Sequence, residues 1–209
     1  MAYHRERQVA SPLVELLETS VDPDPLRQYE RWFREAEAAD VPVPEAAALA
    51  TASPDGRPSA RMVLLKSFDE SGFVFYSGYE SRKGRELAAN PRAALLVHWP
   101  GRQVRIEGAV ERLARAESEA YFRTRPPFSR VAAVASRQSE PIESRKELDS
   151  RFEEARARFG DDPPLPEHWG GFRLAPETYE FWQHRDNRLH DRLRYTRARD
   201  GWKLERLQP

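Results

Sequence analysis

The sequence predicts a mainly β fold: an antiparallel barrel or sandwich with inserted helices. Most strand-like segments are joined by short turns, and the helices are inserted between groups of strands instead of alternating with them. Hydrophobic residues make up 39% and aromatic residues 11% of the 209 residues, enough for a folded core. Together these observations argue against a parallel, doubly wound sheet.

The helices are predicted from caps and helical spacing, and the strands from apolar segments between turns. Asp24 as N-cap and Pro25 in the first turn begin the first helix. Ser81 caps the second, which ends before Asn90-Pro91. The expected helices cover residues 25–39, 81–89, 116–123 and 143–159, with a turn at 126–127. The expected strands cover residues 46–52, 59–68, 73–77, 92–99, 102–113, 179–184, 190–197 and 202–207.

Length and composition exclude several classes of protein. Residues 1–21 show weak periodicity and are expected to form a mobile arm, whereas residues 22–209 are expected to form a single domain. A formal net charge of zero argues against a general nucleic-acid binder, and the absence of cysteine excludes disulfides and thiolate chemistry. No apolar run has membrane-spanning length and the start has no signal-peptide pattern, so we expect a soluble cytoplasmic protein.

Neither a metal site nor a common nucleotide-binding motif is predicted. The five histidines lack ligand spacings apart from the wide His184 and His190 pair. The sequence has no glycine-rich phosphate loop, nucleophile elbow or dinucleotide fingerprint.

Two segments in the first half place cations where an anion could bind. In the expected strand 59–68, Arg61 and Lys66 flank apolar residues on opposite faces, which suits an anion held over the sheet or two side chains that extend to solvent. Arg82 and Lys83 follow the cap Ser81. The free amides and the dipole of a helix N-terminus favour a phosphate there, although a capped surface helix has nearly the same pattern.

Two segments in the second half combine cations with polar and aromatic groups. Tyr121, Arg125 and Ser129 recur every four residues and could converge on one anion, or form a solvated helix end. The dense segment 181–192 could stack on a flat ring, with His190 exchanging protons near neutral pH. Nucleic-acid binding and a balanced β-hairpin are the competing interpretations of that segment.

Taken in order, these segments resemble the pyridoxamine 5′-phosphate oxidase family over residues 24–209. The motifs that carry the resemblance are Arg61-Met-Val-Leu-Leu-Lys66, Ser81-Arg-Lys-Gly84, Arg102-Gln-Val-Arg105, Ser136-Arg-Gln-Ser139, Trp169-Gly-Gly-Phe172, Phe181-Trp-Gln183 and Arg188-Leu-His-Asp-Arg192. The resemblance implies an FMN-binding split barrel, antiparallel and homodimeric, with a C-terminal dimerisation hairpin and a flavin in each cleft between the subunits.

The resemblance also implies a division of roles among the residues. The FMN site would contain Arg61, Met62, Val63, Leu64, Tyr76, Ser77, Arg82, Lys83, Gln103, Gln138, Ser139, Trp182 and Arg192. The substrate site would contain Lys66, Tyr121, Arg125 and Ser129 around the phosphate, and Arg188, Leu189 and His190 near the pyridine ring. Arg188 and His190 would be the catalytic pair.

The implied reaction is oxidation of pyridoxamine or pyridoxine 5′-phosphate at C4′ to pyridoxal 5′-phosphate. A hydride would pass to flavin N5, and O₂ would be reduced to H₂O₂. The protein would contribute orientation and electrostatics. The preferred vitamer is left open.

Two departures from the family pattern keep alternatives open. The arm reads Arg5-Glu6-Arg7-Gln8, so no substrate contact is expected from residues 1–21. His184-Arg-Asp-Asn187 stands where the family commonly has a glycine-containing segment. The alternatives are a phenazine-biosynthesis flavin oxidase that acts on a dihydrophenazine, a non-catalytic flavin- or haem-binding split barrel, and an RNA-binding β domain. The substrate-phosphate residues favour the vitamin enzyme over all three.

Overall fold

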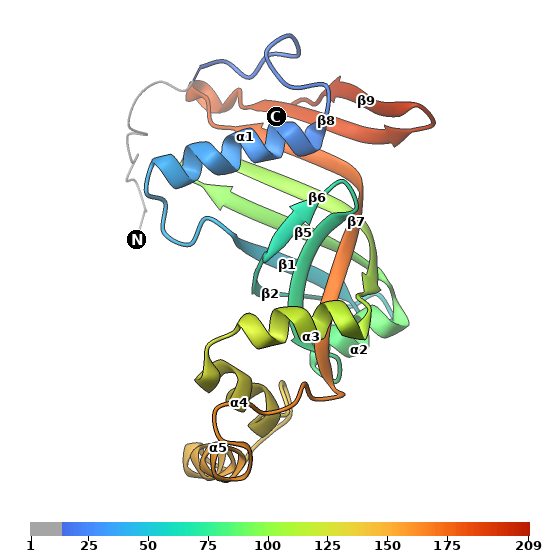
Figure 1. Cartoon of the computed structure of the whole chain (residues 1–209). Coiled ribbons are helices and arrows are strands. Elements are labelled where there is room, and N and C mark those ends of the chain that lie inside the picture. The colour runs from blue at the N-terminus through green and yellow to red at the C-terminus, as the bar shows by residue number, and fades with distance from the viewer. Residues whose placement is uncertain (1–13) are drawn as a thin grey trace, which may run out of the picture.

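One antiparallel sheet of nine strands forms the body of the protein in the computed structural model, which describes residues 14–209 (Figure 1). The strands are β1 (Ala46–Ala52), β2 (Pro58–Leu64), β3 (Ser67–Asp69), β4 (Gly72–Gly78), β5 (Arg92–Trp99), β6 (Arg102–Arg112), β7 (Trp169–Gln183), β8 (Asp191–Ala198) and β9 (Gly201–Arg206). The helices are α1 (Pro25–Ala38), α2 (Arg82–Ala89), α3 (Arg115–Thr124), α4 (Pro127–Ala135), α5 (Arg145–Phe159) and the short 3₁₀ helix η1 (Asp186–Arg188).

The sheet curls because its two edges are joined in sequence. Its order is β2-β1-β5-β6-β7-β4-β3, with β8 paired to β7 and β9 to β8. Only Leu65 and Lys66 separate β2 from β3, so the strands at the two edges of this order must lie close together, and β2 contacts β4. The predicted antiparallel β architecture is therefore confirmed.

Helix α1 packs on the aromatic core of the barrel. The side chain of Asp24 accepts a hydrogen bond from the amide of Leu26 at 2.9 Å, which confirms the predicted N-cap. Tyr29 is fully buried, and its ring packs edge-on against Phe73 with centroids 4.9 Å apart. Trp32 packs in the same way on Phe181 at 5.2 Å. Such edge-to-face pairs add to the stabilisation that burial alone provides.

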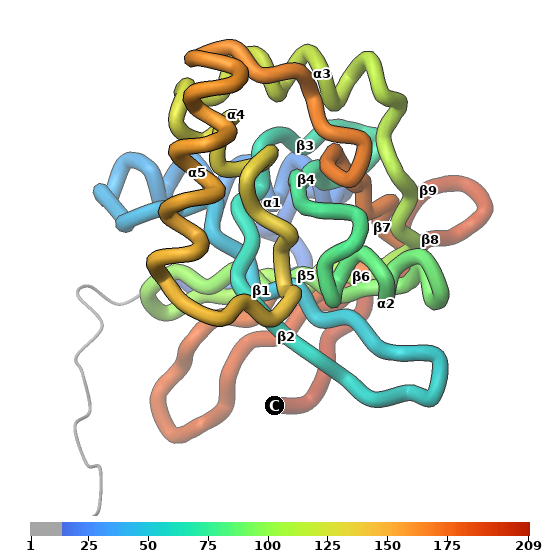
Figure 2. Tube along the Cα trace, turned by 90° about the horizontal axis from the view of Figure 1, so that it is seen from below, coloured from blue at the N-terminus to red at the C-terminus, as the bar shows by residue number. Residues whose placement is uncertain are grey.

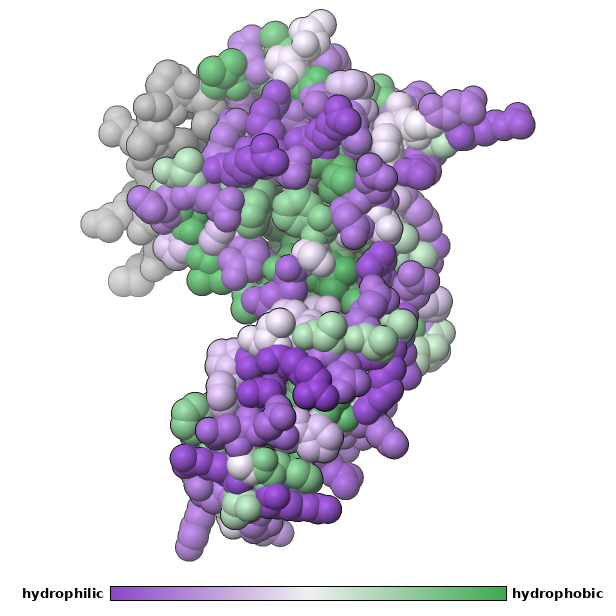
Figure 3. Space-filling view, viewed as in Figure 1, coloured by the Kyte–Doolittle hydropathy of each residue, from purple (hydrophilic) through white to green (hydrophobic). Residues whose placement is uncertain are grey.

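Two groups of elements extend from opposite ends of the barrel. The β8–β9 hairpin lies at the top of Figure 1, with α3, α4 and α5 at the bottom. Figure 2, seen from the helical end, shows α4 and α5 side by side. Figure 3 shows hydrophobic residues across the middle of the molecule and a mostly hydrophilic surface on the helical end. Strand β7 connects the two ends, because it pairs with β4 in its first half and with β8 in its second.

The predicted single strand over residues 59–68 is wrong, since the chain changes partner within it. β2 pairs with β1, whereas β3 pairs with β4. At the break, the amide of Leu65 donates to the carbonyl of Glu45 at 3.0 Å, and the amide of Lys66 donates to that of Val74 at 2.8 Å. Leu65 and Lys66 are therefore the residues at which the chain changes its strand partner from β1 to β4.

The predictions also missed residues 169–178 of β7 and all of α4. Gly170 and Gly171 have low strand propensity, but a Cβ at Gly170 would lie 1.9 Å from the hydroxyl oxygen of Tyr79. Close packing therefore requires a glycine in this strand. Pro126 and Pro127 were interpreted as a turn, yet Pro127 occupies the first turn of α4, where a missing amide costs nothing.

Residues 14–21 are anchored to the C-terminal hairpin. Leu16 is buried; its amide donates to Asp191 Oδ2 at 3.2 Å, and its carbonyl accepts from Arg206 Nη2 at 2.8 Å. Arg206 also pairs with Glu18 at 2.8 Å. The part of the expected mobile arm that the structure describes is thus held in place, and residues 1–13 lie outside the described residues. No helix within residues 14–209 has the length and hydrophobicity needed to span a membrane.

Candidate functional site

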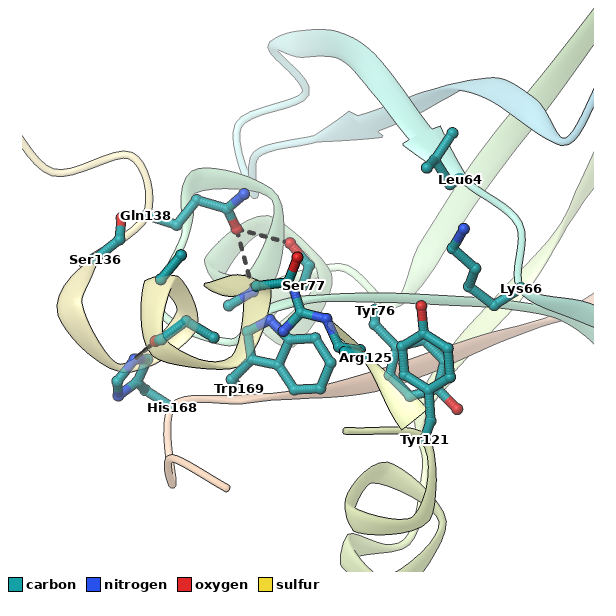
Figure 4. Close-up of a pocket in the computed structure, with 14 residues that line it drawn as sticks. Leu64, Lys66, Tyr76, Ser77, Tyr121, Arg125, Ser136, Gln138, His168 and Trp169 are labelled. Carbon is teal, nitrogen blue, oxygen red and sulfur yellow. Dashed lines mark hydrogen bonds between the residues drawn. The ribbon is translucent and has the colours of Figure 1, made fainter. Parts of the chain in front are cut away.

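A cavity of about 390 Å³ lies at the helical end of the barrel, between the end of β4, helices α3 and α4, and the start of β7 (Figure 4). All four residues predicted to bind the substrate phosphate line it: Lys66, Tyr121, Arg125 and Ser129. Four predicted flavin-binding residues line it as well: Leu64, Tyr76, Ser77 and Gln138. The fold thus brings residues from Leu64 to Trp169 in the sequence together at one cavity.

Arg125 provides an unsatisfied cationic donor at this cavity. Its guanidinium lies over the ring of Trp169, 4.6 Å from the centroid. Its Nη1 is buried and has no hydrogen-bond partner within residues 14–209. Burial lowers the pKa of Arg125, as expected for a cation that lacks a compensating charge. These features suit an anionic ligand, which would supply both the missing acceptor and the missing charge.

Stacked aromatic rings form one wall of the cavity. Tyr76 and Tyr121 stack with centroids 3.8 Å apart, and Tyr76 stacks on Trp169 at 5.5 Å. Burial raises the pKa of both tyrosines, so their hydroxyls remain protonated hydrogen-bond donors near neutral pH. Trp169 was not predicted as a site residue. The Trp169-Gly-Gly-Phe172 motif contains this residue, but the resemblance assigns it no role.

A second cationic group lies at the N-terminus of α2, beside the cavity. The side chain of Ser81 caps the helix by accepting from the amide of Gly84 at 3.2 Å, as predicted. Lys83 is buried, and its Nζ donates to the hydroxyl of Ser77 at 3.0 Å. Burial and the nearby charge of Arg61 lower the pKa of Lys83 to about 8. Within residues 14–209, no carboxylate lies within ion-pair distance of this ammonium. Lys83 therefore also fits an anion.

Two of the predicted flavin-site arginines, Arg61 and Arg82, share one buried carboxylate. Glu86 Oε1 accepts from Arg82 Nε at 2.9 Å, and Glu86 Oε2 lies 3.3 Å from Arg61 Nη2. Burial raises the pKa of Glu86, but hydrogen bonds from Ser59, Thr51 and Arg82, together with the charge of Arg61, lower it to about 2. Glu86 is thus ionised at any physiological pH. It is a further residue that the predictions did not include.

The loop after α4 reaches β4 through Gln138. Its side-chain oxygen accepts from the Ser77 hydroxyl at 2.8 Å and from the Gly78 amide at 3.1 Å (Figure 4). Ser139 follows with a φ of 73°, in the left-handed region, and does not line the cavity.

The predicted flavin residues of β2 point in alternate directions: Met62 is 63% exposed, whereas Val63 packs against the core. Neither of these two lines the cavity.

The remaining predicted residues form a separate cluster near the C-terminus. Gln103, Trp182 and Arg192 are cross-strand neighbours on β6, β7 and β8. His190 lies beside them, with its ring centroid 4.7 Å from that of Trp182. Its Nδ1 accepts from the Arg185 amide at 3.1 Å, which leaves Nε2 as the protonated nitrogen of the neutral ring. Burial, with the charges of His184 and Arg188, lowers the pKa of His190.

The loop before β8 presents its side chains to solvent. Arg188 has a φ of 61° and an exposed side chain, and Leu189 is 71% exposed. None of the C-terminal cluster residues lines the cavity. Trp169 at the cavity and Trp182 in the cluster lie at opposite ends of β7, about 40 Å apart along the strand at about 3.3 Å per residue. One chain therefore does not bring the two predicted parts of the site together.

Comparison with known protein families identifies the family of this chain. A family model described as pyridoxamine 5′-phosphate oxidase matches residues 33–159, more than half of the chain. The chain belongs to the pyridoxamine 5′-phosphate oxidase family. A second model, described as the pyridoxine 5′-phosphate oxidase C-terminal dimerisation region, matches residues 169–209, which contain β7, β8 and β9.

Curated relatives agree with this assignment to the pyridoxamine 5′-phosphate oxidase family. The pyridoxine/pyridoxamine 5′-phosphate oxidase of Rubrobacter xylanophilus is 58% identical over 197 residues, which cover 93% of this chain and 91% of that protein. The enzyme of the same name from Bordetella petrii is 56% identical over 197 residues, 93% of each chain. The predicted family, and with it the prediction of an oxidoreductase, is confirmed.

Solved structures of related proteins confirm the fold. PhzG from Burkholderia lata, in complex with tetrahydrophenazine-1-carboxylic acid, superposes with a TM-score of 0.89 at 35% identity, covering 94% of this chain and 98% of that one. A pyridoxamine 5′-phosphate oxidase-related, FMN binding protein from Nostoc punctiforme has a TM-score of 0.70 at 19% identity, covering 88% and 98%. The second likeness concerns the fold alone. The predicted split barrel is confirmed.

Proposed function

We propose that this protein is an FMN-dependent oxidase that converts pyridoxamine or pyridoxine 5′-phosphate to pyridoxal 5′-phosphate and reduces O₂ to H₂O₂. The observation that carries the proposal is the presence of two distinct cationic groups, one that lines the cavity and one that reaches it through the Ser77 hydroxyl. One is centred on Arg125 and the other on Lys83. Two phosphate monoesters, one on the cofactor and one on the substrate, would account for both groups.

The group around α2 fits the phosphate of FMN. Lys83 is buried and has no carboxylate partner in the described part of the chain, and Arg82 lies on the first turn of the helix, where free amides also favour an anion. Ser77 and Gln138 connect this group to the cavity. When bound, FMN would supply a hydride acceptor at N5 and transfer the electrons to O₂. The protein itself orients the ring and excludes water around it.

The group around Arg125 fits the phosphate of the substrate. Arg125 offers a free Nη1, and Ser129 and Tyr121 add hydroxyls from the same side of the cavity. Lys66 faces them from the break between β2 and β3, with its Nζ 3.9 Å from Glu45. Anchoring a phosphate at a fixed point limits how the rest of the substrate can lie, and so positions the carbon that is oxidised.

We infer that the active form is a homodimer, since one chain leaves the site incomplete. A second copy can bring the C-terminal cluster to the cavity, and the segment that contains this cluster matches a dimerisation region. The barrel also exposes an apolar face for such a contact. Met62 on β2, Ala48 on β1 and Leu96 on β5 form one cross-strand row, in which Met62 is 63% and Leu96 36% exposed.

In this dimer, Arg188 and His190 of the partner subunit would contact the pyridine ring. Their side chains are exposed or half-buried in the single chain and thus accessible to a second copy. The lowered pKa of His190 keeps its imidazole neutral at neutral pH, with the proton on Nε2. His190 can therefore donate a hydrogen bond to the substrate from Nε2, while the cationic Arg188 orients the ring.

A phenazine-type oxidase is the second candidate, and the likeness to PhzG supports it. The ligand of that protein, tetrahydrophenazine-1-carboxylic acid, carries one carboxylate and no phosphate, so its single charge requires fewer donors than the dianion of a phosphate monoester. Lys66, Tyr121, Arg125 and Ser129 all line the cavity here. Their convergence favours the phosphorylated vitamer.

A substrate panel tests the proposal directly. The purified protein should be yellow, release FMN on denaturation, and form pyridoxal 5′-phosphate and peroxide from either phosphorylated vitamer in air. Protein that cannot bind added FMN would overturn the proposal. Turnover of a dihydrophenazine without turnover of either vitamer would establish the second candidate instead.

A further inference from the structure

The buried carboxylate of Glu86 connects helix α2 to two strands of the barrel. Its Oε2 accepts from the hydroxyls of Thr51 on β1 at 2.5 Å and Ser59 on β2 at 2.6 Å. The same oxygen lies 3.3 Å from Arg61 Nη2, and Oε1 accepts from Arg82 Nε at 2.9 Å. Only 8% of the Glu86 side chain is exposed. Both oxygens are therefore occupied, and the carboxylate has one defined orientation.

This orientation determines which donors of Arg82 remain available. Arg82 contacts Glu86 through Nε alone, and within residues 14–209 its two terminal nitrogens have no protein partner. The side chain is 61% exposed, so without Glu86 it would sample many rotamers. Held at Nε, the guanidinium presents its two terminal NH₂ groups on the side away from Glu86. That edge of the guanidinium can bind a phosphate in bidentate fashion.

Arg61 is held more completely than Arg82. Its Nη1 donates to the carbonyl of Leu49 at 3.2 Å and to Thr51 at 2.5 Å, and its Nη2 donates to Ser59 at 2.5 Å. Arg61 thus contributes mainly a fixed positive charge beside Lys83, whose pKa that charge helps to lower. Three cations against one carboxylate leave two net positive charges, which matches the dianion of a phosphate monoester.

We propose that Glu86 is a positioning residue through which the site selects a phosphorylated flavin over an unphosphorylated one. The inference rests on the proposed function, since it concerns the phosphate of FMN. The charge of Glu86 itself repels a phosphate, so its contribution is geometric: it aligns Arg82 and fixes Arg61 before the ligand binds. Such preorganisation reduces the conformational entropy lost on binding.

Titration of the apo-protein with FMN and with riboflavin, followed by flavin fluorescence, tests this role. Glu86→Gln removes the charge but keeps the size of the side chain. It is expected to raise the FMN dissociation constant about tenfold or more, the effect of losing one charge-assisted hydrogen bond. The riboflavin constant should change by less than about twofold, because riboflavin has no phosphate for Arg82 to bind.

Glu30→Gln is the matched control, because it removes the same kind of contact from another helix. Glu30 pairs with Arg34 at 3.2 Å with the i,i+4 spacing that Glu86 and Arg82 share, but on the exposed face of α1. It should leave both flavin constants unchanged.

Ser59→Ala is a second, milder variant that keeps the carboxylate and removes one of its donors. It should raise the FMN dissociation constant about three- to tenfold and leave the riboflavin constant unchanged. If Glu86→Gln does not fold, this variant tests the positioning role in its place. Equal weakening of both flavins would show a merely structural role. Unchanged or tighter FMN binding would show that charge repulsion outweighs positioning, and would also overturn the inference. Wild-type protein that binds neither flavin would instead overturn the proposed function, and this inference with it.

Discussion

Replacement of Arg125 by alanine should weaken substrate binding while leaving the flavin in place. The structure gives a physical reason for this separation. Arg125 lines the cavity and its buried Nη1 has no partner among residues 14–209, whereas the proposed flavin-phosphate group lies at the N-terminus of α2. A phosphate oxygen can accept from Nη1 without breaking an existing protein hydrogen bond.

The size of the effect follows from that contact. A hydrogen bond to a charged group contributes about 1.5 to 3 kcal/mol, which corresponds to about a ten- to hundredfold increase in KM when substrate binding is at equilibrium. Arg125→Lys should recover only part of this loss. Lysine keeps the charge, but it lacks both the planar fork and the stacking over Trp169.

The assay measures initial rates of pyridoxal 5′-phosphate and peroxide formation, together with the flavin content of each variant. Arg123→Ala is the matched control, because Arg123 lies two residues away on α3, pairs with Glu119 at 2.7 Å and does not line the cavity. Unphosphorylated pyridoxamine is the second control, and its kcat/KM should be the same in Arg125→Ala and wild type. Loss of FMN in parallel with the rise in KM, or an equal loss with pyridoxamine, would refute the assignment of Arg125 to the substrate phosphate.

Three further predictions concern other parts of the site. Arg188→Ala should lower kcat as well as affinity, since this residue is proposed to orient the reacting ring; an unchanged kcat would contradict that position. A bound phosphate should raise the pKa of Lys83 above its value of about 8 in the free protein, so binding takes up a proton and FMN affinity should fall as the pH rises past about 8. Lys83→Met should abolish this pH dependence, and riboflavin should not show it. Trp169→Leu should raise KM for the phosphorylated substrate about two- to thirtyfold at constant kcat, because it removes the cation–π contact below Arg125; an unchanged KM would show that Arg125 is held by other contacts.

Local features of the fold were predictable because their causes lie within a few residues. The caps at Asp24 and Ser81 act on amides two and three residues away, and the structure shows both hydrogen bonds. The β8–β9 hairpin follows from a short turn between two alternating segments. The structure places Lys66 and Arg125, with the other two predicted substrate-phosphate residues, at one cavity, and their binding of a phosphate stays a prediction.

The tertiary structure decided the features that depend on distant partners. The break between β2 and β3 exists because the chain exchanges β1 for β4, and no signal near Leu65 records that change. The first half of β7 is a strand despite Gly170, because tight packing against Tyr79 outweighs the low strand propensity of glycine.

The arrangement of the site also depends on residues that are distant in the sequence. The residue types and their order in the sequence were enough to identify the family and to predict two groups that bind phosphates. The sequence did not show that Arg188 and His190 lie at the other end of β7 from the cavity. Nor did it show that the carboxylate of Glu86 pairs with both Arg61 and Arg82. Those facts depend on strand register and on the curling of the sheet, which many weak long-range contacts set together and no single segment encodes.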